Sequence, residues 1–457
     1  MVERSRALAF ALSTATAGLL LAATVIGGCR GKNESPGGND GAGASAARPA
    51  SREAAPASRE EPPASRESQN PLDLFVETAG NYLISTQSED GSWPYFRSEA
   101  ADFANAEPHA ALGTPITLLN LTHTGFEAST AFRRGADYLR GRMIEGYLWS
   151  LYEPSQFGDT AWVEPDANDT AVCLTVLAGR VPVEAAALKK VRALFDRNRA
   201  PDGLYRTYFD GFYKQKGFVP DRNVPSLGVN LNVLGFFGRY ELPRAGLLEA
   251  IRSAMQQERY WEKTPYVHSL PVLAYLASNA VEHGAAEAGD LQRKLLTDFE
   301  AGAGAPPTFA EKLPTLELAA YVKARAHACL LDHKPCQQLD MTVFHLAKRR
   351  NGDGSWNATP FYEYDTNPEA LEAFVARRDF KLPRPRGGVA YDVEKALAGP
   401  GTIHYYDGSP AETTSFALKA LVFYRELLNR RGSFMMLGSA SPGASPSPSE
   451  SAGASPP

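Results

Sequence analysis

Acidic side chains stand at two places in the sequence where their spacing suits the handling of protons. Residues 166–170 read Asp-Ala-Asn-Asp-Thr, and residues 412–414 read Glu-Thr-Thr. Buried carboxyl groups at such sites act as general acids or bases. The simpler interpretation is helix capping, with Asp166 at the N-cap and Asp169 at the third helical position. Recurrence at two equivalent places favours capping and leaves a chemical role open.

Three long segments carry further acids and many aromatic residues: 147–165, 199–225 and 357–411. Aromatic rings suit apolar ligands and the faces of sugars, and a pair of carboxyl groups can supply acid and base. We therefore expect a binding mouth, against the alternative that the aromatics merely fill one end of the domain. The candidate catalytic residues are Asp166, Asp169, Glu412, His404, Asp365 and Asp407. The candidate ligand-binding residues are Trp149, Tyr152, Trp162, Asn168, Tyr208, Tyr213, Tyr362, Tyr364, Tyr405 and Tyr406.

A repeat of roughly 55 residues must position these groups. Each repeat begins with an amphipathic helix and ends with a helix that is apolar on most sides, which is typical of surface and buried helices respectively. The amphipathic helices are predicted over 72–87, 128–142, 184–198, 244–257, 290–301 and 337–350. The apolar helices are predicted over 109–121, 168–178, 226–238, 267–277, 314–331 and 412–427. Twelve alternating helices predict an all-α fold, an (α/α)6 toroid of six inner and six outer helices with long loops on one face.

A turn recurs after several of the amphipathic helices. It reads Gln-Ser-Glu-Asp-Gly-Ser-Trp over 87–93 and Arg-Asn-Gly-Asp-Gly-Ser-Trp over 350–356, with weaker copies over 142–148 and 199–205. Glycine supplies the positive φ that ends a helix, and Asp-Gly favours the turn. We predict that Trp93 and Trp356 are structural and pack against the helices.

The Gln-x-x-x-Gly-x-Trp pattern at 87–93 resembles the QW motifs of the squalene cyclase and protein prenyltransferase superfamily. The segment 166–171 resembles the Asp-x-Asp-Asp-Thr-Ala signature of class II terpene cyclases. The resemblance covers most of 71–437 through short motifs, and it implies a terpenoid cyclase-like α-α toroid. In that family the middle acid protonates the polyene, and this position is Asn168 here, so the resemblance does not carry over class II cyclisation. The Asp-x-Cys pair of the zinc-dependent prenyltransferases has no counterpart either.

The N-terminus predicts export and anchoring. Arg4 and Arg6 precede an apolar run over 7–26, which is the pattern of a secretory signal. The run ends in Ile-Gly-Gly-Cys, which resembles a bacterial lipobox and implies lipidation of Cys29. The alternative is an uncleaved transmembrane anchor. We therefore expect a lipoprotein signal peptide over 1–28, a lipid anchor and disordered linker over 29–70, the toroid over 71–437 and a disordered Ser/Pro/Ala tail over 438–457.

The remaining cysteines, the absence of metal-binding motifs and the net charge exclude several classes of function. Cys329 and Cys336 flank a short turn and are a candidate disulfide in an oxidising compartment, whereas Cys173 lies in an apolar helix and is predicted to be buried. Neither a C-x-x-C nor an H-E-x-x-H motif occurs, so we expect no metal and no other cofactor. Lys+Arg 47 against Asp+Glu 52 leaves a net charge of −5, which argues against nucleic-acid binding.

Three functions remain open for this cell-envelope domain, held to a membrane through its lipid anchor. The first is a toroid that binds or modifies an isoprenoid-like ligand in its central cavity, following the resemblance. The second is an envelope polysaccharide hydrolase or lyase on an (α/α)6 barrel. The third is a non-catalytic binding scaffold. Whether the domain is an enzyme is not decided by its sequence.

Overall fold

A computed structural model describes residues 71–98, 113–150 without 145, 165–209, 225–257, 269–304, 306–365 and 404–438, together with 103, 107, 108, 223, 260 and 267. All of them belong to the second of the two units of the chain, Arg66–Pro457. The signal peptide, Cys29, the linker and residues 439–457 of the tail lie outside the described residues. Among the described helices, none is both long and apolar enough to cross a membrane.

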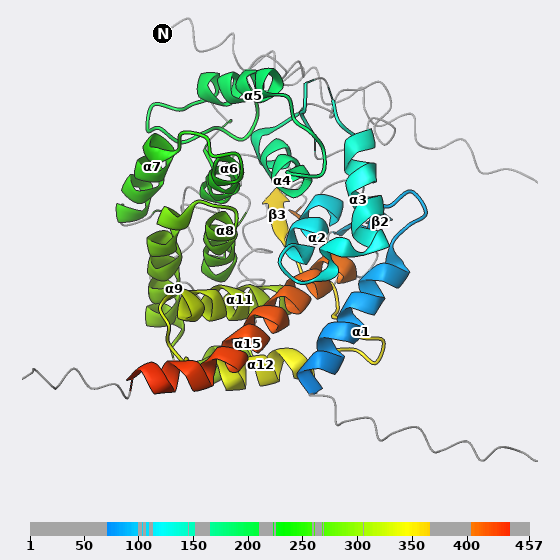
Figure 1. Cartoon of the computed structure of the whole chain (residues 1–457), viewed down its shortest axis with the longest axis vertical. Coiled ribbons are helices and arrows are strands. Elements are labelled where there is room, and N and C mark those ends of the chain that lie inside the picture. Colours follow the sequence, from blue (N-terminus) through cyan, green and yellow to red (C-terminus); the bar gives the residue numbers. More distant parts are fainter. Residues whose placement is uncertain are drawn as a thin grey trace, which may run out of the picture. The chain divides into compact units, whose positions relative to one another are not determined.

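The described helices alternate between two layers (Figure 1). The outer helices are α1 (Pro71–Thr86), α3 (Thr130–Gly141), α5 (Ala185–Arg197), α7 (Ala245–Gln256), α9 (Gly289–Ala303) and α12 (Leu339–Lys348). The inner helices are α2 (Gly113–Leu121), α4 (Ala167–Leu177), α6 (Leu227–Arg239), α8 (Leu270–Glu282), α11 (Thr315–Leu331) and α15 (Pro410–Gly438). A five-residue helix, α10 (Pro306–Ala310), precedes α11, and two short 3-10 helices are η1 (Phe126–Ala128) and η5 (Ala286–Ala288). The all-α toroid predicted from the sequence is confirmed.

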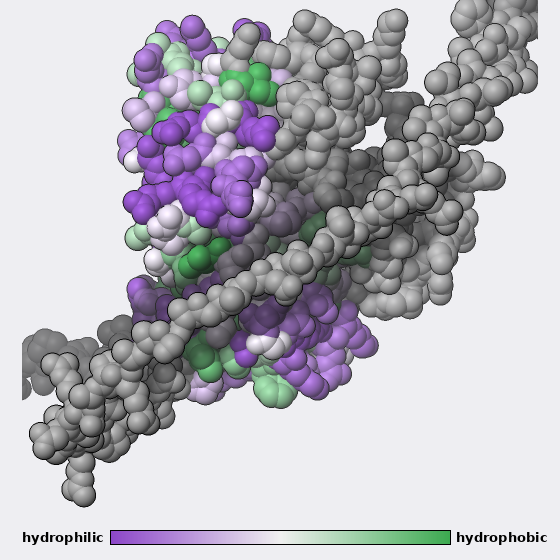
Figure 2. Space-filling view, turned by 90° about the vertical axis from the view of Figure 1, so that its right-hand side faces the viewer, coloured by the Kyte–Doolittle hydropathy of each residue, from purple (hydrophilic) through white to green (hydrophobic). Residues whose placement is uncertain are grey.

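Hydropathy decides the layer of each helix. Every residue of α4 is buried, whereas α5 buries only Val191, Leu194 and Phe195 and turns its charged side chains outward. On the face shown in Figure 2, the coloured residues are mostly hydrophilic, with hydrophobic residues scattered among them. A helix that is apolar on all sides is stable only where other parts of the chain cover every side of it. The uniformly apolar helices therefore take the inner positions.

The inner helices form a closed ring. Each contacts the next in the order α2, α4, α6, α8, α11 and α15, and α15 contacts α2 again. The outer layer closes as well, because the turn after α12 docks on α1. There the guanidinium of Arg350 donates to Thr78 Oγ1 at 2.7 Å. A Cβ on Gly354, whose φ is +94°, would stand 2.6 Å from the carbonyl oxygen of Thr78, so this contact requires glycine.

The recurring turn fastens the outer layer to the inner one. The indole N–H groups of Trp93, Trp149 and Trp356 each donate to a carbonyl ten residues earlier, at 2.8 Å. Their backbone N–H groups donate to threonine hydroxyls on the next inner helix, those of Thr114, Thr170 and Thr414 respectively. Trp93 and Trp356 are buried as predicted. Trp149 occupies the same place in its own repeat and is equally buried, which differs from its expected position in a binding mouth.

A small antiparallel sheet joins segments that the sequence analysis treated as loops. Its strands are β1 (Phe96–Ser98), β2 (Glu107–Pro108), β3 (Tyr362–Asp365) and β4 (His404–Gly408), in the order β2-β1-β4-β3. The strands span two to five residues each. Such short strands carry no readable alternation, and β1 pairs with a segment at the far end of the chain, so no local pattern predicts them.

The cysteines and the length of the last helix complete the description of the fold. A disulfide joins Cys329 and Cys336 with Cα atoms 6.2 Å apart, as predicted, and Cys173 is free and buried. Helix α15 continues to Gly438, beyond the predicted end at 427. Arg430 and Arg431 of this extension form ion pairs with Glu426 and Asp340 respectively.

Candidate functional site

The lumen of the ring has two unlike ends. Inner and outer helices alternate along the chain, so all inner helices begin at one end of the ring and finish at the other. We call the first the mouth end, where the long connections enter, and the second the floor end. Candidate acids of the sequence analysis lie at the mouth end, because Asp166, Asp169 and Glu412 are in or next to the first turns of α4 and α15.

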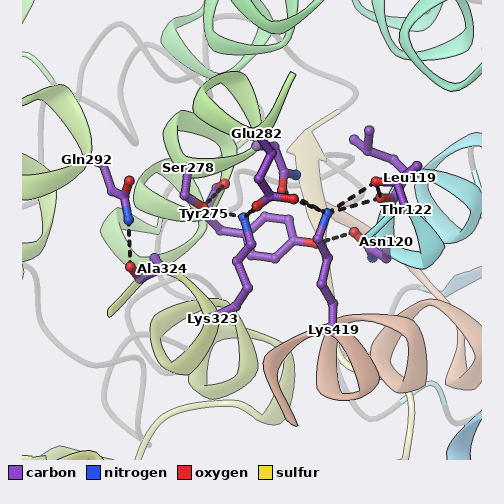
Figure 3. A network of polar contacts seen from close by, with 11 residues as sticks. Leu119, Asn120, Thr122, Tyr275, Ser278, Glu282, Gln292, Lys323, Ala324 and Lys419 are labelled. Carbon is purple, nitrogen blue, oxygen red and sulfur yellow. Dashed lines mark hydrogen bonds and ion pairs between the residues drawn. The ribbon is translucent and has the colours of Figure 1, made fainter. Parts of the chain in front are cut away.

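A buried charged cluster occupies the floor end (Figure 3). The carboxylate of Glu282, the last residue of α8, pairs with the ammonium groups of Lys323 from α11 and Lys419 from α15. The side-chain oxygen of Asn279 accepts from both lysines, at 2.8 and 3.2 Å. Lys323 also donates to Ser278 Oγ at 2.6 Å. Both lysine side chains are fully buried and Glu282 is 5% exposed, so this lysine–glutamate cluster is shielded from bulk water.

The cluster reaches across the ring. Lys419 donates to the carbonyl oxygen of Leu119 at 3.2 Å, at the end of α2. The hydroxyl of Tyr275 on α8 donates to Asn120 Oδ1 on α2, and the Asn120 amide donates to Ser415 Oγ on α15 at 2.8 Å. Because α2 and α8 are three places apart in a six-helix ring, these contacts pass through its centre. Side chains therefore close the lumen at this level.

Charge compensation decides the protonation of the cluster. Burial alone would raise the pKa of Glu282, but Lys323 and Lys419 outweigh it and hold that pKa well below its usual range. Burial lowers the pKa of Lys323 to about 7, against the opposing attraction of Glu282. Burial also lowers the pKa values of the adjacent His283 and His327 to about 3, so both are neutral near pH 7. The carboxylate stays ionised and links the end of α8 to α11 and α15.

Sequence reasoning missed this cluster, although a signal was present. Lys323 and Lys419 stand in the middle of helices that were predicted to be buried on all sides. A lysine is almost never fully buried unless it is paired, so each predicted a buried acidic partner. The partner itself lies at the end of another helix and follows only from the ring.

At the mouth end, Asp166 caps α4. Its carboxylate accepts from the backbone N–H of Asp169 at 2.9 Å, which confirms the capping interpretation for Asp166. Asp169 has a different environment, because its Oδ2 atom is buried without a hydrogen-bond partner. Its Oδ1 atom receives a long contact of 3.4 Å from the amide of Asn168. The Asn168 oxygen in turn accepts from the amide of Asn232 on α6 at 2.9 Å.

Burial raises the pKa values of both carboxyl groups of this pair. It raises the pKa of Asp166 to about 6. Burial and the neighbouring charge of Asp166 raise the pKa of Asp169 well above its usual range. Two buried carboxyl groups without a paired cation hold a proton near neutral pH. The pair can therefore donate a hydrogen bond or a proton at the mouth end.

Glu412 begins α15 in the same way that Asp169 begins α4. Its backbone N–H donates to Ser409 Oγ at 2.9 Å, so Ser409 is the cap and Glu412 stands three residues after it. The Glu412 side chain is fully buried. Since the serine does the capping, the carboxyl group of Glu412 is not needed for it.

The other candidates from the sequence analysis lie in the small sheet, beside the start of α4 or outside the described residues. Strand register places Asp365 opposite His404, Tyr362 opposite Asp407 and Tyr364 opposite Tyr405, while Tyr406 stands opposite Glu363. The sheet thus brings three acidic or basic candidates and four tyrosines together on two strands. Tyr208 lies beside the start of α4, bridged to Asp166 through the backbone. Tyr152, Trp162 and Tyr213 lie outside the described residues.

No group of three His, Cys, Asp or Glu side chains within the described ranges is placed to hold a metal ion.

Comparison with known proteins supports the fold. No family model matches the chain, and no curated protein matches it. Among solved structures, the type II terpene cyclase MstE from Scytonema matches with a TM-score of 0.51 at 16% identity, covering 78% of this chain and 99% of that chain. A protein from Actinoplanes matches with a TM-score of 0.49 at 17% identity, covering 78% and 99%. A possible GH105 member from Salmonella enterica matches with 0.45 at 9% identity, covering 81% and 97%.

Only the first of these similarities is close enough for an argument, and at its low identity it concerns architecture alone. The α/α toroid is the fold that this chain shares with MstE. The chemistry of the site has to be argued from the residues of this chain.

Proposed function

We propose that the chain is a lipid-anchored protein of the cell envelope whose toroid binds its ligand in the mouth-end half of the lumen. One observation carries the position of the ligand: the lysine–glutamate cluster closes the floor end, whereas buried carboxyl and amide groups gather at the mouth end. Ligand sites of rigid helical scaffolds are concave and hold a few convergent polar groups. The mouth end has such groups on α4, α6 and α15.

The ligand is not cyclised by the acid of class II terpene cyclases. At the position of that acid stands Asn168, whose amide is held by Asn232. An amide has no proton of comparable acidity to give to an alkene. The carboxyl pair of Asp166 and Asp169 stands beside it, and Asp166 caps α4.

The lipid anchor rests on the sequence alone, and it has a direct test. We expect a clickable fatty acid fed to the producing cells to label the full chain, and the label to disappear in Cys29→Ala. The variant should also leave the membrane fraction. A Cys29→Ala protein that stays in the membrane without label would instead favour the uncleaved transmembrane anchor.

Native mass spectrometry tests the ligand site. The full chain is extracted from its own membranes in mild detergent, and we expect a small-molecule adduct on part of it. Asn232→Leu should remove the adduct, because it takes a polar group from the mouth end. Lys334→Ala is the matched control: its side chain is 69% exposed after the end of α11, on the floor side.

The adduct also decides between the two ligand classes. An isoprenoid would support the first function, and an oligosaccharide would favour the glycan-active alternative. If the adduct is lost in Lys334→Ala and kept in Asn232→Leu, the ligand binds on the floor side and the proposal is wrong. A chain that carries no adduct would favour a scaffold without a small ligand.

A further inference from the structure

Exposed large hydrophobic side chains gather on one part of the outer surface. Among the described residues, six such side chains are between 38% and 57% exposed. Four of them lie at the floor end, where outer helices begin: Leu74 on α1, Leu331 at the end of α11, and Met341 and Phe344 on α12. The other two, Ile84 and Met143, lie toward the mouth end, and none of the six is on α3, α5, α7 or α9. We call the first four the floor-rim patch.

Contacts of α15 bring the parts of this patch on α1 and α12 to one height. Two consecutive residues of α15 bind the two helices: the hydroxyl of Tyr424 donates to Asp340 at 2.8 Å, and the guanidinium of Arg425 donates to Asp73 at 3.0 Å. Each aspartate directly precedes a residue of the floor-rim patch on its own helix. Helices α1 and α12 meet beside α15 (Figure 1), so they present their patch residues on adjacent parts of the rim.

The outward stripe of α12 is apolar where other outer helices are charged. Met341, Phe344 and Lys348 are exposed and follow one another at three and four residues, which places them on one side of the helix. The exposed positions of α5 include Lys189 and Lys190 instead. Single exposed hydrophobic residues are ordinary, but several on one rim mark a surface that another body covers.

The membrane tether enters the domain at the same rim. The linker leads from Cys29 to Pro71, the first residue of α1, and Leu74 lies within the first turn after it. A flexible linker of this length spans about 35 Å, so the bilayer lies within reach of the rim. The two aspartates beside the patch are each paired with an arginine of α15, which offsets their repulsion from acidic headgroups.

We propose that the floor-rim patch docks on the lipid bilayer, with its side chains inserted at the boundary between headgroups and acyl chains. The inference rests on the proposed lipid anchor and adds the surface that faces the membrane. Large apolar side chains are stabilised by leaving water, and the anchor keeps the bilayer at a high effective concentration, so a small patch suffices. Because the contact is apolar, it needs no acidic lipid and persists at high salt.

A fluorescent label beside the patch tests this docking. Lys348→Cys in the full lipidated chain is labelled with NBD, whose emission shifts to the blue in apolar surroundings, and reconstituted in phosphatidylcholine liposomes. Labelling is selective, because Cys173 is buried and the other two cysteines of the toroid form a disulfide. Lys190→Cys is the matched control on α5, three places from α12 in the outer layer. We expect a blue shift and quenching by doxyl lipids on α12, and neither on α5.

Substitution of the patch then shows what causes the signal. In the Lys348→Cys background, Met341→Ser with Phe344→Ser should abolish the blue shift and the quenching, since each apolar side chain raises the docked population at least about tenfold. Signals that survive this change, or equal signals on α12 and α5, would overturn the inference. A blue shift without doxyl quenching that grows with protein concentration would assign the patch to a second copy of the chain. A signal confined to acidic liposomes at low salt would mean attraction by charge, and both results contradict apolar docking.

Intact mass of the same samples separates this inference from the proposed function. A chain that lacks lipid on Cys29 and keeps its N-terminal apolar run would contradict the lipid anchor. The uncleaved run would still hold that chain to the bilayer, so the label on α12 would still report whether the patch is inserted.

Discussion

Buried carboxyl groups in this toroid differ in whether a cation is placed beside them. Glu282 has two ammonium groups and stays ionised in the closed half of the lumen. Asp166 and Asp169 have each other and no paired cation among the described contacts, so burial raises both pKa values. A carboxyl group is thus held ionised at the floor end, whereas at the mouth end burial favours its protonated form.

Asp169→Asn should flatten the pH dependence of stability. The folded pair binds protons more tightly than the unfolded chain, whose aspartates keep a pKa of 3.8. The stabilisation from these protons is present at low pH and is lost as pH rises through about 6. The wild-type melting temperature should therefore fall more between about pH 4.5 and 7.5 than that of the variant. Parallel curves for both proteins would show that the pair is not protonated in the folded state.

Lys419→Met should be strongly destabilising. Removing one partner of a buried ion pair costs about 3–5 kcal/mol, because the other charge remains buried. Lys294→Met is the control: its ion pair with Asp298 on α9 is exposed, and such pairs contribute at most about 1 kcal/mol. Urea unfolding of the two variants checks the difference. Similar midpoints would mean that the cluster is not needed to close the ring.

At the scale of elements, the turn that carries Trp93, Trp149 or Trp356 makes the same contacts in three repeats. It ends an outer helix, buries a tryptophan and bonds to a threonine of the next inner helix. The structure adds Trp149 to the two copies that the sequence shows clearly. The sequence copy over 142–148 looked weak because its aromatic residue stands one position later than expected.

Trp149→Ala should destabilise the protein by about 3–5 kcal/mol, as truncation of large core aromatics does, and by as much as Trp93→Ala or Trp356→Ala. Phe344→Ala is the control, because that ring is 57% exposed on α12 and its loss should cost less than about 0.5 kcal/mol. Thermal unfolding measures both. A Trp149→Ala variant with wild-type stability but without the co-purifying adduct would return Trp149 to the ligand site.

At the scale of the whole molecule, the two ends of the lumen differ in the side chains that line them. The floor end is filled by side chains from α2, α8, α11 and α15, which hold the ring closed. The mouth end keeps its polar groups beside the sheet that leads into α15. The proposed function therefore confines the ligand to the mouth-end half of the lumen.

We expect no cyclisation of squalene by the wild type or by Asn168→Asp. The amide cannot protonate an alkene, and a restored acid still lacks a long apolar chamber because the cluster occupies the floor end. Incubation of the detergent-solubilised full chain with squalene, followed by gas chromatography of the extract, checks both proteins. Cyclic product from the wild type would refute the argument. Product from Asn168→Asp alone would show that a sufficient chamber exists.

The sequence by itself determined the twelve helices, their layers, the turns with Trp93 and Trp356 and the disulfide. These features follow from local periodicity and short-range spacing, which the chain carries wherever it is read. Capping by Asp166 was also readable, since it needs only the first turn of α4.

Tertiary structure alone decided which side chains meet inside the ring. Glu282, Lys323 and Lys419 come from three helices, and strand β1 pairs with β4 from the far end of the chain. Contacts across the axis form only once the ring has closed, and no local pattern of residues encodes which side chains meet there.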